Sequence, residues 1–190
     1  MANQDPKPSS LPTLPVDVKR LPKLGNTIKL SLEDRNVGAK QTAALIDHLG
    51  VESVESLEAS LNFKPWARDG VQVDGEISSL LHSQCPVTLE KVAQQLHTEF
   101  KAKFVPPNSK LSKPQLNDEG EMIFDIDSED IPDIYEGDTL DAWAIVMEYL
   151  ALEIDYFARA ENATFKAPTN SQPSEEENVS PFAKLSALKK

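Results

Sequence analysis

The sequence predicts an α+β domain in which a mostly antiparallel, curled β-sheet, a meander, packs against one long C-terminal helix and one shorter N-terminal helix. Two patterns carry this prediction. Apolar and polar residues alternate through three consecutive runs between residues 51 and 104, and the stretch 140–155 repeats apolar residues at three- and four-residue spacing. The first period is that of a half-buried strand, and the second is that of a helix.

The N-terminal part of the chain predicts a tail, a short strand and the shorter helix. Prolines crowd the first residues, so residues 1–13 are predicted to form a disordered arm. The segment 14–25 alternates apolar residues ahead of prolines and a glycine, which favours an edge strand that leads into a turn. A helix is then expected from a cap at Asp34 to about Leu49, where Gly50 supplies a stop signal.

The middle of the chain predicts three antiparallel strands joined as a meander. In the first two runs the apolar residues fall on odd positions, and a turn around Pro65 separates the runs. In the third run the apolar residues fall on even positions. The residues between Leu81 and Val92 must therefore absorb a change of parity, and Cys85 and Pro86 are predicted to form this structural corner.

The C-terminal half predicts a loop and then the longer helix. Residues 106–120 lack periodicity and contain several helix and strand breakers, which indicates a long loop. The helix is expected over 140–155, with its cap at Asp138. One α+β domain is therefore predicted to span residues 14–160.

The last part of the chain predicts a flexible tail over residues 161–190. Its final segment, residues 180–190, restores apolar residues at three-residue spacing beside lysines, which is typical of a short docking motif. The partner-binding residues predicted here, with two cations near the N-terminus, are Phe182, Lys184, Leu185, Lys189, Lys190, Arg20 and Lys23.

The net charge of −12 is unevenly distributed along the chain. Residues 115–161 hold fifteen Asp and Glu residues but only one basic residue, Arg159. A domain that binds RNA by itself usually carries a basic face, which this stretch lacks. An acidic surface favours basic partners such as ribosomal proteins, or it simply keeps the protein solvated. A single cysteine and a polar N-terminus favour a cytoplasmic protein that is not inserted in a membrane.

Three candidate chemistries have weaker support than their structural alternatives. His48, His82 and His97 lie on different predicted elements, which does not favour a zinc site. Residues 125–136 carry acids at the spacing of a calcium loop but lack the glycine of its sixth position. Cys85 and His82 lack a glycine-rich oxyanion turn. The sequence therefore predicts a non-enzyme, with no catalytic, cofactor-binding or metal-binding residues and no small-molecule substrate.

Several stretches of the sequence resemble a known family in the same order along the chain. They are LPKLG at 21–25, QCPVTLE at 84–90, DTLDAWAIVMEYLALEID at 138–155 and SPFAKLSALKK at 180–190. Together they resemble the YceD family, known as large ribosomal RNA subunit accumulation proteins. Many relatives carry a C-x-x-C motif at the corner, where this sequence has Cys85 followed by Thr88. A role that depends on the cysteine pair should not transfer to this chain.

The resemblance implies a bacterial cytoplasmic factor, with plastid relatives, that supports ribosome biogenesis. We therefore expect a non-catalytic assembly factor that supports accumulation of large-subunit ribosomal RNA. Its expected partners are ribosomal proteins, large-subunit ribosomal RNA precursor particles, or both. The alternative is an acidic protein-protein interaction adaptor that is unrelated to ribosomes.

Overall fold

The computed structural model describes residues 11–35, 37–112, 131–161 and 163–164. Residues 1–10 of the predicted arm, residues 113–120 of the predicted loop and residues 165–190 of the predicted tail lie outside the described residues.

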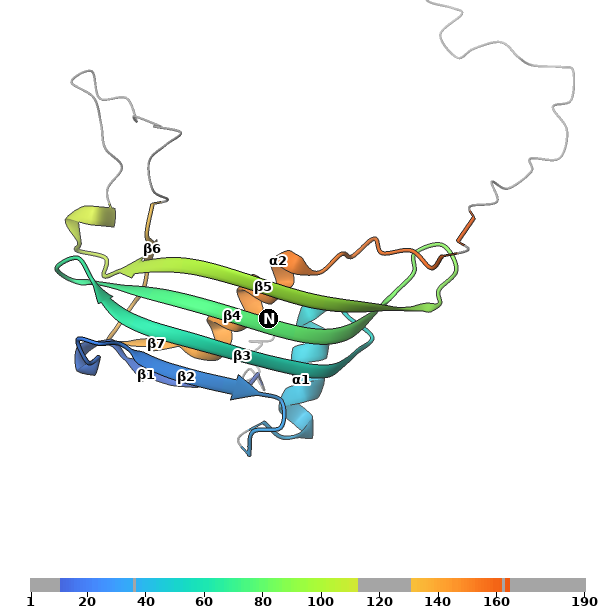
Figure 1. The fold of residues 1–190 in the computed structure, drawn as a ribbon, viewed down its shortest axis with the longest axis horizontal. Coiled ribbons are helices and arrows are strands. Elements are labelled where there is room, and N and C mark those ends of the chain that lie inside the picture. The colour runs from blue at the N-terminus through green and yellow to red at the C-terminus, as the bar shows by residue number, and fades with distance from the viewer. Residues whose placement is uncertain (1–10, 36, 113–130, 162, 165–190) are drawn as a thin grey trace, which may run out of the picture.

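A five-stranded sheet forms the centre of the structure (Figure 1). In order across the sheet its strands are β2 (Asn26–Ser31), β3 (Ser53–Trp66), β4 (Gly70–Gln84), β5 (Lys91–Val105) and β6 (Asp133–Ile134). The pairs from β2 to β5 are antiparallel, whereas β6 runs parallel to the end of β5. The prediction of a mostly antiparallel sheet in an α+β fold is therefore confirmed.

The change of parity between the second and third long strands is built into their pairing. Val71 pairs with Phe104 and Ile77 pairs with Thr98, so odd positions of β4 share a face with even positions of β5. Odd positions of β3 lie on the same face, because Phe63 pairs with Val73. This inner face holds the apolar rows that the alternation predicted, and it forms the floor of the core.

The sheet is open rather than curled, so that part of the fold prediction was wrong. Strong curling is usually introduced by bulges or by glycine kinks repeated along the strands. The pairing between β3 and β4 is irregular only between Val54 and Ser56, and the pairing between β4 and β5 continues in one register from Val71 to Gln84. Long regular pairing therefore leaves a gently twisted sheet with two separate edges, as Figure 1 shows.

Two helices cover the inner face of the sheet and leave the other face open (Figure 1). They are α1 (Ala39–Leu49) and α2 (Ala142–Glu153), which differ by one residue in length. The predicted contrast between a long and a shorter helix is therefore not found. Leu45 and Leu49 of α1 and Val146 and Leu150 of α2 enter the common core. No helix in the described ranges is both long and apolar enough to cross a membrane.

Both helices begin later than the sequence predicted, because the expected caps have other partners. The carboxylate of Asp34 accepts a hydrogen bond from the Ser31 N–H at 2.9 Å, which fixes the turn after β2. Asp138 pairs with Lys19 at 2.6 Å. The actual cap of α2 is Asp141, whose carboxylate accepts hydrogen bonds from the N–H groups of Trp143 at 3.0 Å and Leu14 at 2.9 Å.

A second, small sheet joins the two ends of the described fold. It pairs β1 (Pro15–Asp17) with β7 (Thr139–Asp141), and a short 3-10 helix, η1 (Val18–Arg20), follows β1. The edge strand predicted within 14–25 is therefore present, but its partner is a distant strand. Another 3-10 helix, η2 (Lys110–Ser112), lies within the segment predicted as a loop.

A glycine at the centre of β4 allows an aromatic side chain to lie across the inner face. Gly75 pairs with Phe100, and a Cβ atom built at Gly75 would overlap the Phe100 ring. The ring stacks on Tyr149 of α2 with centroids 3.7 Å apart and planes 7° apart. Gly75 therefore makes room for the contact that places α2 on the sheet.

Substitution of Gly75 by alanine tests this contact. We expect Gly75→Ala to lower the free energy of unfolding by about 1–3 kcal/mol, because the added methyl group displaces the Phe100 ring. Urea unfolding measures the change. Gly38→Ala is the control, since the nearest atom there is the end of the Gln41 side chain, 3.1 Å from the added Cβ. Equal losses in the two variants would contradict the proposed overlap.

Candidate functional site

The outer face of the sheet is the open polar surface of the described structure. The odd positions of β3 and β4 and the even positions of β5 face the helices. The outer face is therefore formed by the even positions of β3 and β4 and the odd positions of β5. Neither helix crosses this face in Figure 1. An antiparallel sheet commonly has one face packed on the core and one solvated face, and this solvated face is the first candidate surface for a partner.

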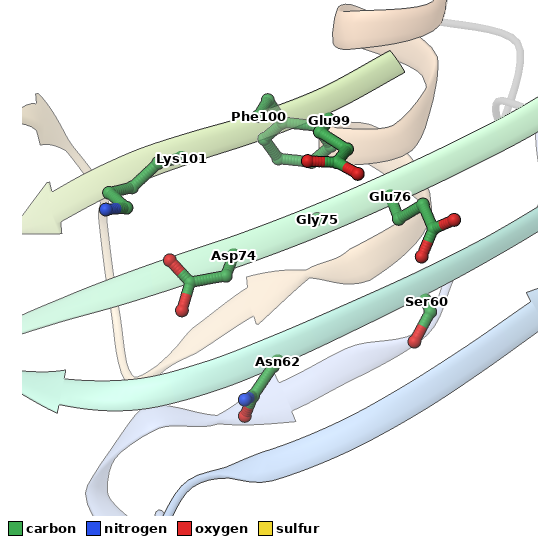
Figure 2. Close-up of a pocket in the computed structure, with 8 residues that line it drawn as sticks. All are labelled: Ser60, Asn62, Asp74, Gly75, Glu76, Glu99, Phe100 and Lys101. Atoms are coloured by element: carbon green, nitrogen blue, oxygen red, sulfur yellow. The ribbon is translucent and has the colours of Figure 1, made fainter. Parts of the chain in front are cut away.

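A shallow groove runs across the outer face. Its main part, about 500 Å³, is lined by Ser60, Asn62, Asp74, Gly75, Glu76, Glu99, Phe100 and Lys101 (Figure 2). A second depression of about 370 Å³ shares Ser60 and Glu76 with the first and continues onto β2 at Lys29 and Ser31. Most of the residues that line it have polar or charged side chains, so the groove is an open polar surface rather than a closed apolar ligand cavity.

The charges in the groove are neutralised at one end only. Lys64 lies 2.7 Å from Asp74, and Gln72 donates a hydrogen bond to the same carboxylate at 2.7 Å. Partial burial opposes ionisation of Asp74, but the two hydrogen bonds outweigh it and lower the pKa of Asp74 below its ordinary value. Further along, Glu76 of β4 lies directly opposite Glu99 of β5. Two like charges in this position repel each other and destabilise the sheet.

An aromatic and basic cluster lies at the hairpin end of the same face. The Lys103 ammonium group sits 4.8 Å from the centroid of the Trp66 ring, within the range of a cation–π contact. Lys101 lies on the same face of β5, opposite Asp74. The outer face therefore changes from basic and aromatic near the β3–β4 turn to acidic at its centre, and it can contact partners of either charge.

The Cys85 corner joins β4 to β5, and Cys85 itself is fully buried. The Cys85 N–H donates to the Glu90 carbonyl at 2.8 Å and the Leu89 N–H donates to the Cys85 carbonyl at 2.9 Å, which closes the turn. The hydroxyl group of Thr88, the backbone N–H of Ala160 and the backbone N–H of Thr88 lower the pKa of the Cys85 thiol to about 7. Pro86 is exposed on the outside of the turn.

The corner does not bring the thiol to a catalytic base. His82 contacts Ser53 at 3.4 Å and Glu55 at 3.6 Å, on the face opposite to buried Cys85. His97 contacts Ser78 at 3.1 Å, also on the outer face. Within the described residues, no three His, Cys, Asp or Glu side chains gather in a way that could hold a metal ion. Residues 125–130, the first half of the candidate calcium loop 125–136, lie outside the described residues.

Gln94 fixes the end of α2 to the sheet. Its side-chain oxygen accepts a hydrogen bond from the Asp155 N–H at 3.0 Å, and its nitrogen donates to the Asp155 carbonyl at 2.8 Å and to Ser83 Oγ at 2.7 Å. Gln94 is buried, so its amide group cannot rely on water and needs these hydrogen-bond partners. This clamp also keeps the following segment beside the corner, where the Ala160 N–H reaches the Cys85 sulfur.

The predicted partner-binding residues are only partly placed by the structure. Arg20 and Lys23 are both exposed, and Arg20 pairs with Asp17 at 3.2 Å. The other predicted partner-binding residues lie outside the described residues: Phe182, Lys184, Leu185, Lys189 and Lys190. The structure does not bring the N-terminal pair into the outer-face groove.

Comparison with known proteins identifies the family. The model of the YceD family, described as large ribosomal RNA subunit accumulation protein YceD, matches residues 73–189, which is more than half of the chain. The chain belongs to the YceD family. The matched region of this YceD chain holds most of β4, all of β5 and α2, the Cys85 corner and the Gln94 clamp. No curated protein matches the chain, and no solved structure matches it either.

Sequence reasoning missed the Gln94 clamp of this YceD chain and the acidic pair Glu76 and Glu99. Gln94 interrupts the apolar positions of β5 with a polar side chain, and this was the signal for a buried clamp. Glu76 and Glu99 become neighbours only through the register of β4 and β5, which residue spacing alone does not reveal. The alternation of Ile28 and Leu30 could have predicted β2, but the run is short and follows a proline-rich turn.

Replacement of Gln94 tests the clamp. We expect Gln94→Ala to lower the free energy of unfolding by about 2–3 kcal/mol, because both backbone groups of Asp155 lose their buried partner. Hydrogen exchange at the Asp155 amide should also become faster. Gln95→Ala is the matched control: Gln95 is exposed on the outer face, and its loss should cost less than about 0.5 kcal/mol.

The pH dependence of unfolding tests the Cys85 environment. The pKa of the thiol is lowered from 9.0 to about 7 on folding, so the folded state binds fewer protons than the unfolded state between these values. The stabilising contribution should be present above about pH 9 and lost as the pH falls through about 7. Urea unfolding of the wild type and of Cys85→Ala measures it. A stability difference that does not change between pH 6 and 9 would contradict the shift.

Proposed function

We propose that this YceD chain is a non-catalytic ribosome biogenesis factor that supports accumulation and assembly of the large ribosomal subunit by binding ribosomal components. The observation that carries the proposal is the family match over residues 73–189, because the family is described by accumulation of the large ribosomal RNA subunit. The proposed partners are ribosomal proteins, large-subunit ribosomal RNA precursor particles, or both, and the proposed location is the cytoplasm.

The described surfaces support a binding role rather than a catalytic one. The outer-face groove is open, and its polar groups come from four strands instead of converging on one point. The thiol of Cys85 is buried, and His82 lies on the opposite face. These observations favour a protein that presents a broad surface to a macromolecule, and they do not supply the nucleophile and base of a hydrolase.

The groove matches a ribosomal partner in two ways. Its acidic centre, with Glu76 and Glu99, suits the basic extensions by which proteins commonly contact ribosomal RNA. The hairpin end of the same outer face, with Trp66 and Lys103, suits phosphate groups and stacked bases. In this proposal the tail residues Phe182, Lys184, Leu185, Lys189 and Lys190, with Arg20 and Lys23, add contacts to the same particles.

Sedimentation through a density gradient tests the proposal. The intact chain should migrate with precursors of the large subunit, and depletion of the protein should lower the ratio of large-subunit to small-subunit ribosomal RNA. If charged surfaces carry the contact, the chain should dissociate from particles above roughly 0.5 M salt, where ionic screening is strong. The double variant Glu76→Gln, Glu99→Gln should migrate less with particles, and Gln95→Ala, also on the outer face, should behave as wild type.

Two outcomes would contradict the proposal. A chain that remains at the top of the gradient at low salt, while it is recovered with a non-ribosomal protein, would support the acidic adaptor instead. An unchanged ribosomal RNA ratio after depletion would separate the chain from large-subunit accumulation.

A further inference from the structure

Three large apolar side chains are exposed together at the end of α2. Leu152, Tyr156 and Phe157 expose 75%, 47% and 78% of their surface, and they lie within six residues of one another. We call these three residues the α2-end patch. Tyr156 lies over the end of α1, since its ring comes within 3.9 Å of a Cβ atom built at Gly50. Leu152 lies in the last turn of α2, and Tyr156 and Phe157 lie in the orange segment that follows α2 in Figure 1.

The backbone just after α2, which carries Tyr156 and Phe157, is held by hydrogen bonds and is not a frayed helix end. Gln94 holds both backbone groups of Asp155, directly before Tyr156. The Phe157 N–H donates to the Asp155 carboxylate at 2.9 Å, and the Ala158 N–H donates to the Asp155 carbonyl at 3.3 Å. A group of large apolar side chains held outward in this way is typical of an interaction surface.

The charges around the patch define the chemistry of its occupant. Glu148, Glu153 and Asp155 are exposed and lie close to the patch in the sequence, and Arg159 is the one basic residue between Asp141 and Glu161. Glu153 accepts a hydrogen bond from Thr98 at 3.1 Å, and none of the three acids forms a salt bridge within the described residues. The occupant should therefore combine apolar side chains with positive charge.

We propose that residues 180–190 of the same chain bind the α2-end patch. This segment has Phe182, Leu185 and Leu188 at three-residue spacing, three lysines and no acid. Its composition is thus complementary to the apolar patch and to the acidic residues beside it. Phe182 and Leu185 cover the patch, and the lysines approach Glu148, Glu153 and Asp155. This is the recognition mode of a short amphipathic segment on an apolar surface.

The length of the connecting chain favours binding within one molecule. Thr164 follows Phe157 by seven residues, so it lies at most about 25 Å from the patch. The sixteen residues from Phe165 to Ser180 have a typical end-to-end distance of about 22 Å if the linker is flexible. A linker whose length matches the span gives the highest effective concentration, in the millimolar range, so weak contacts suffice.

The proposal does not depend on the ribosomal role. If both are correct, residues 180–190 contact the patch in the free protein and exchange it for ribosomal components in the bound protein. Particle binding tests the ribosomal role. Crosslinking in the isolated protein tests the contact between residues 180–190 and the patch, so either proposal can fail without the other.

Zero-length crosslinking of the full chain with a carbodiimide tests the proposal, because this reagent joins lysines only to carboxylates in contact with them. Mass spectrometry should show links from Lys184, Lys189 or Lys190 to Glu148, Glu153 or Asp155. A mixture of ¹⁴N-labelled and ¹⁵N-labelled protein distinguishes links within one chain from links between chains. We expect linked peptides of a single isotope.

Variants of exposed side chains provide the controls. Phe157→Ser and Phe182→Ser should each reduce the yield of these links at least fivefold. Leu24→Ser removes another apolar side chain, 96% exposed, in the turn before β2, and it should leave the yield unchanged. Circular dichroism melting of Phe157→Ser and Leu24→Ser checks that the fold is retained.

Three results would overturn the proposal. Links of mixed isotope composition would assign the patch to a second copy of the chain. Equal links from the three lysines to acids across the molecule, including Glu76 and Glu99, would show that the segment has no fixed site. A yield unaffected by Phe157→Ser and Phe182→Ser would show that the apolar contact is absent, which would leave the patch to a partner protein.

Discussion

The register between β4 and β5 is the constraint on which the rest of the structure depends. Pairing Val71 with Phe104 places odd positions of one strand and even positions of the next on the same face. A shift of one residue would send the apolar side chains at the even positions of β5 to the solvent. The six residues between Gln84 and Lys91 make this register possible, and buried Cys85 sits at the point where the chain turns.

The same register divides the molecule into a face for packing and a face for binding. On the inner face it brings Phe100 over Gly75 to meet Tyr149, and it brings Gln94 under Asp155. These two contacts locate α2 and the segment after it. The alternate, polar residues of the same strands point to the outer face, where they line an open groove. The end of α2 is consequently rigid but apolar, so the fold offers two interaction surfaces of different chemistry.

The corner holds the cysteine of this chain by local hydrogen bonds. Here the Thr88 N–H donates to the Cys85 sulfur at 3.4 Å, and its hydroxyl group lowers the thiol pKa. The Cys85 sulfur is therefore both buried and hydrogen-bonded. Cys85 therefore stabilises the turn, and the proposed activity rests on the surfaces.

The sequence by itself determined the three long strands, the position of the corner and the family. Each of these depends on a local pattern, since burial of one face imposes a period of two that any single strand displays. Tertiary structure alone decided where the helices begin and which polar groups meet. Asp34 and Asp138 have the chemistry of helix caps, but Ser31 and Lys19 are their partners. Glu76 and Glu99 become neighbours only through strand pairing. Ser31 is close to Asp34 in sequence, but Lys19 and Glu99 are far from their neighbours Asp138 and Glu76. A local sequence pattern does not show which distant groups the fold will bring together.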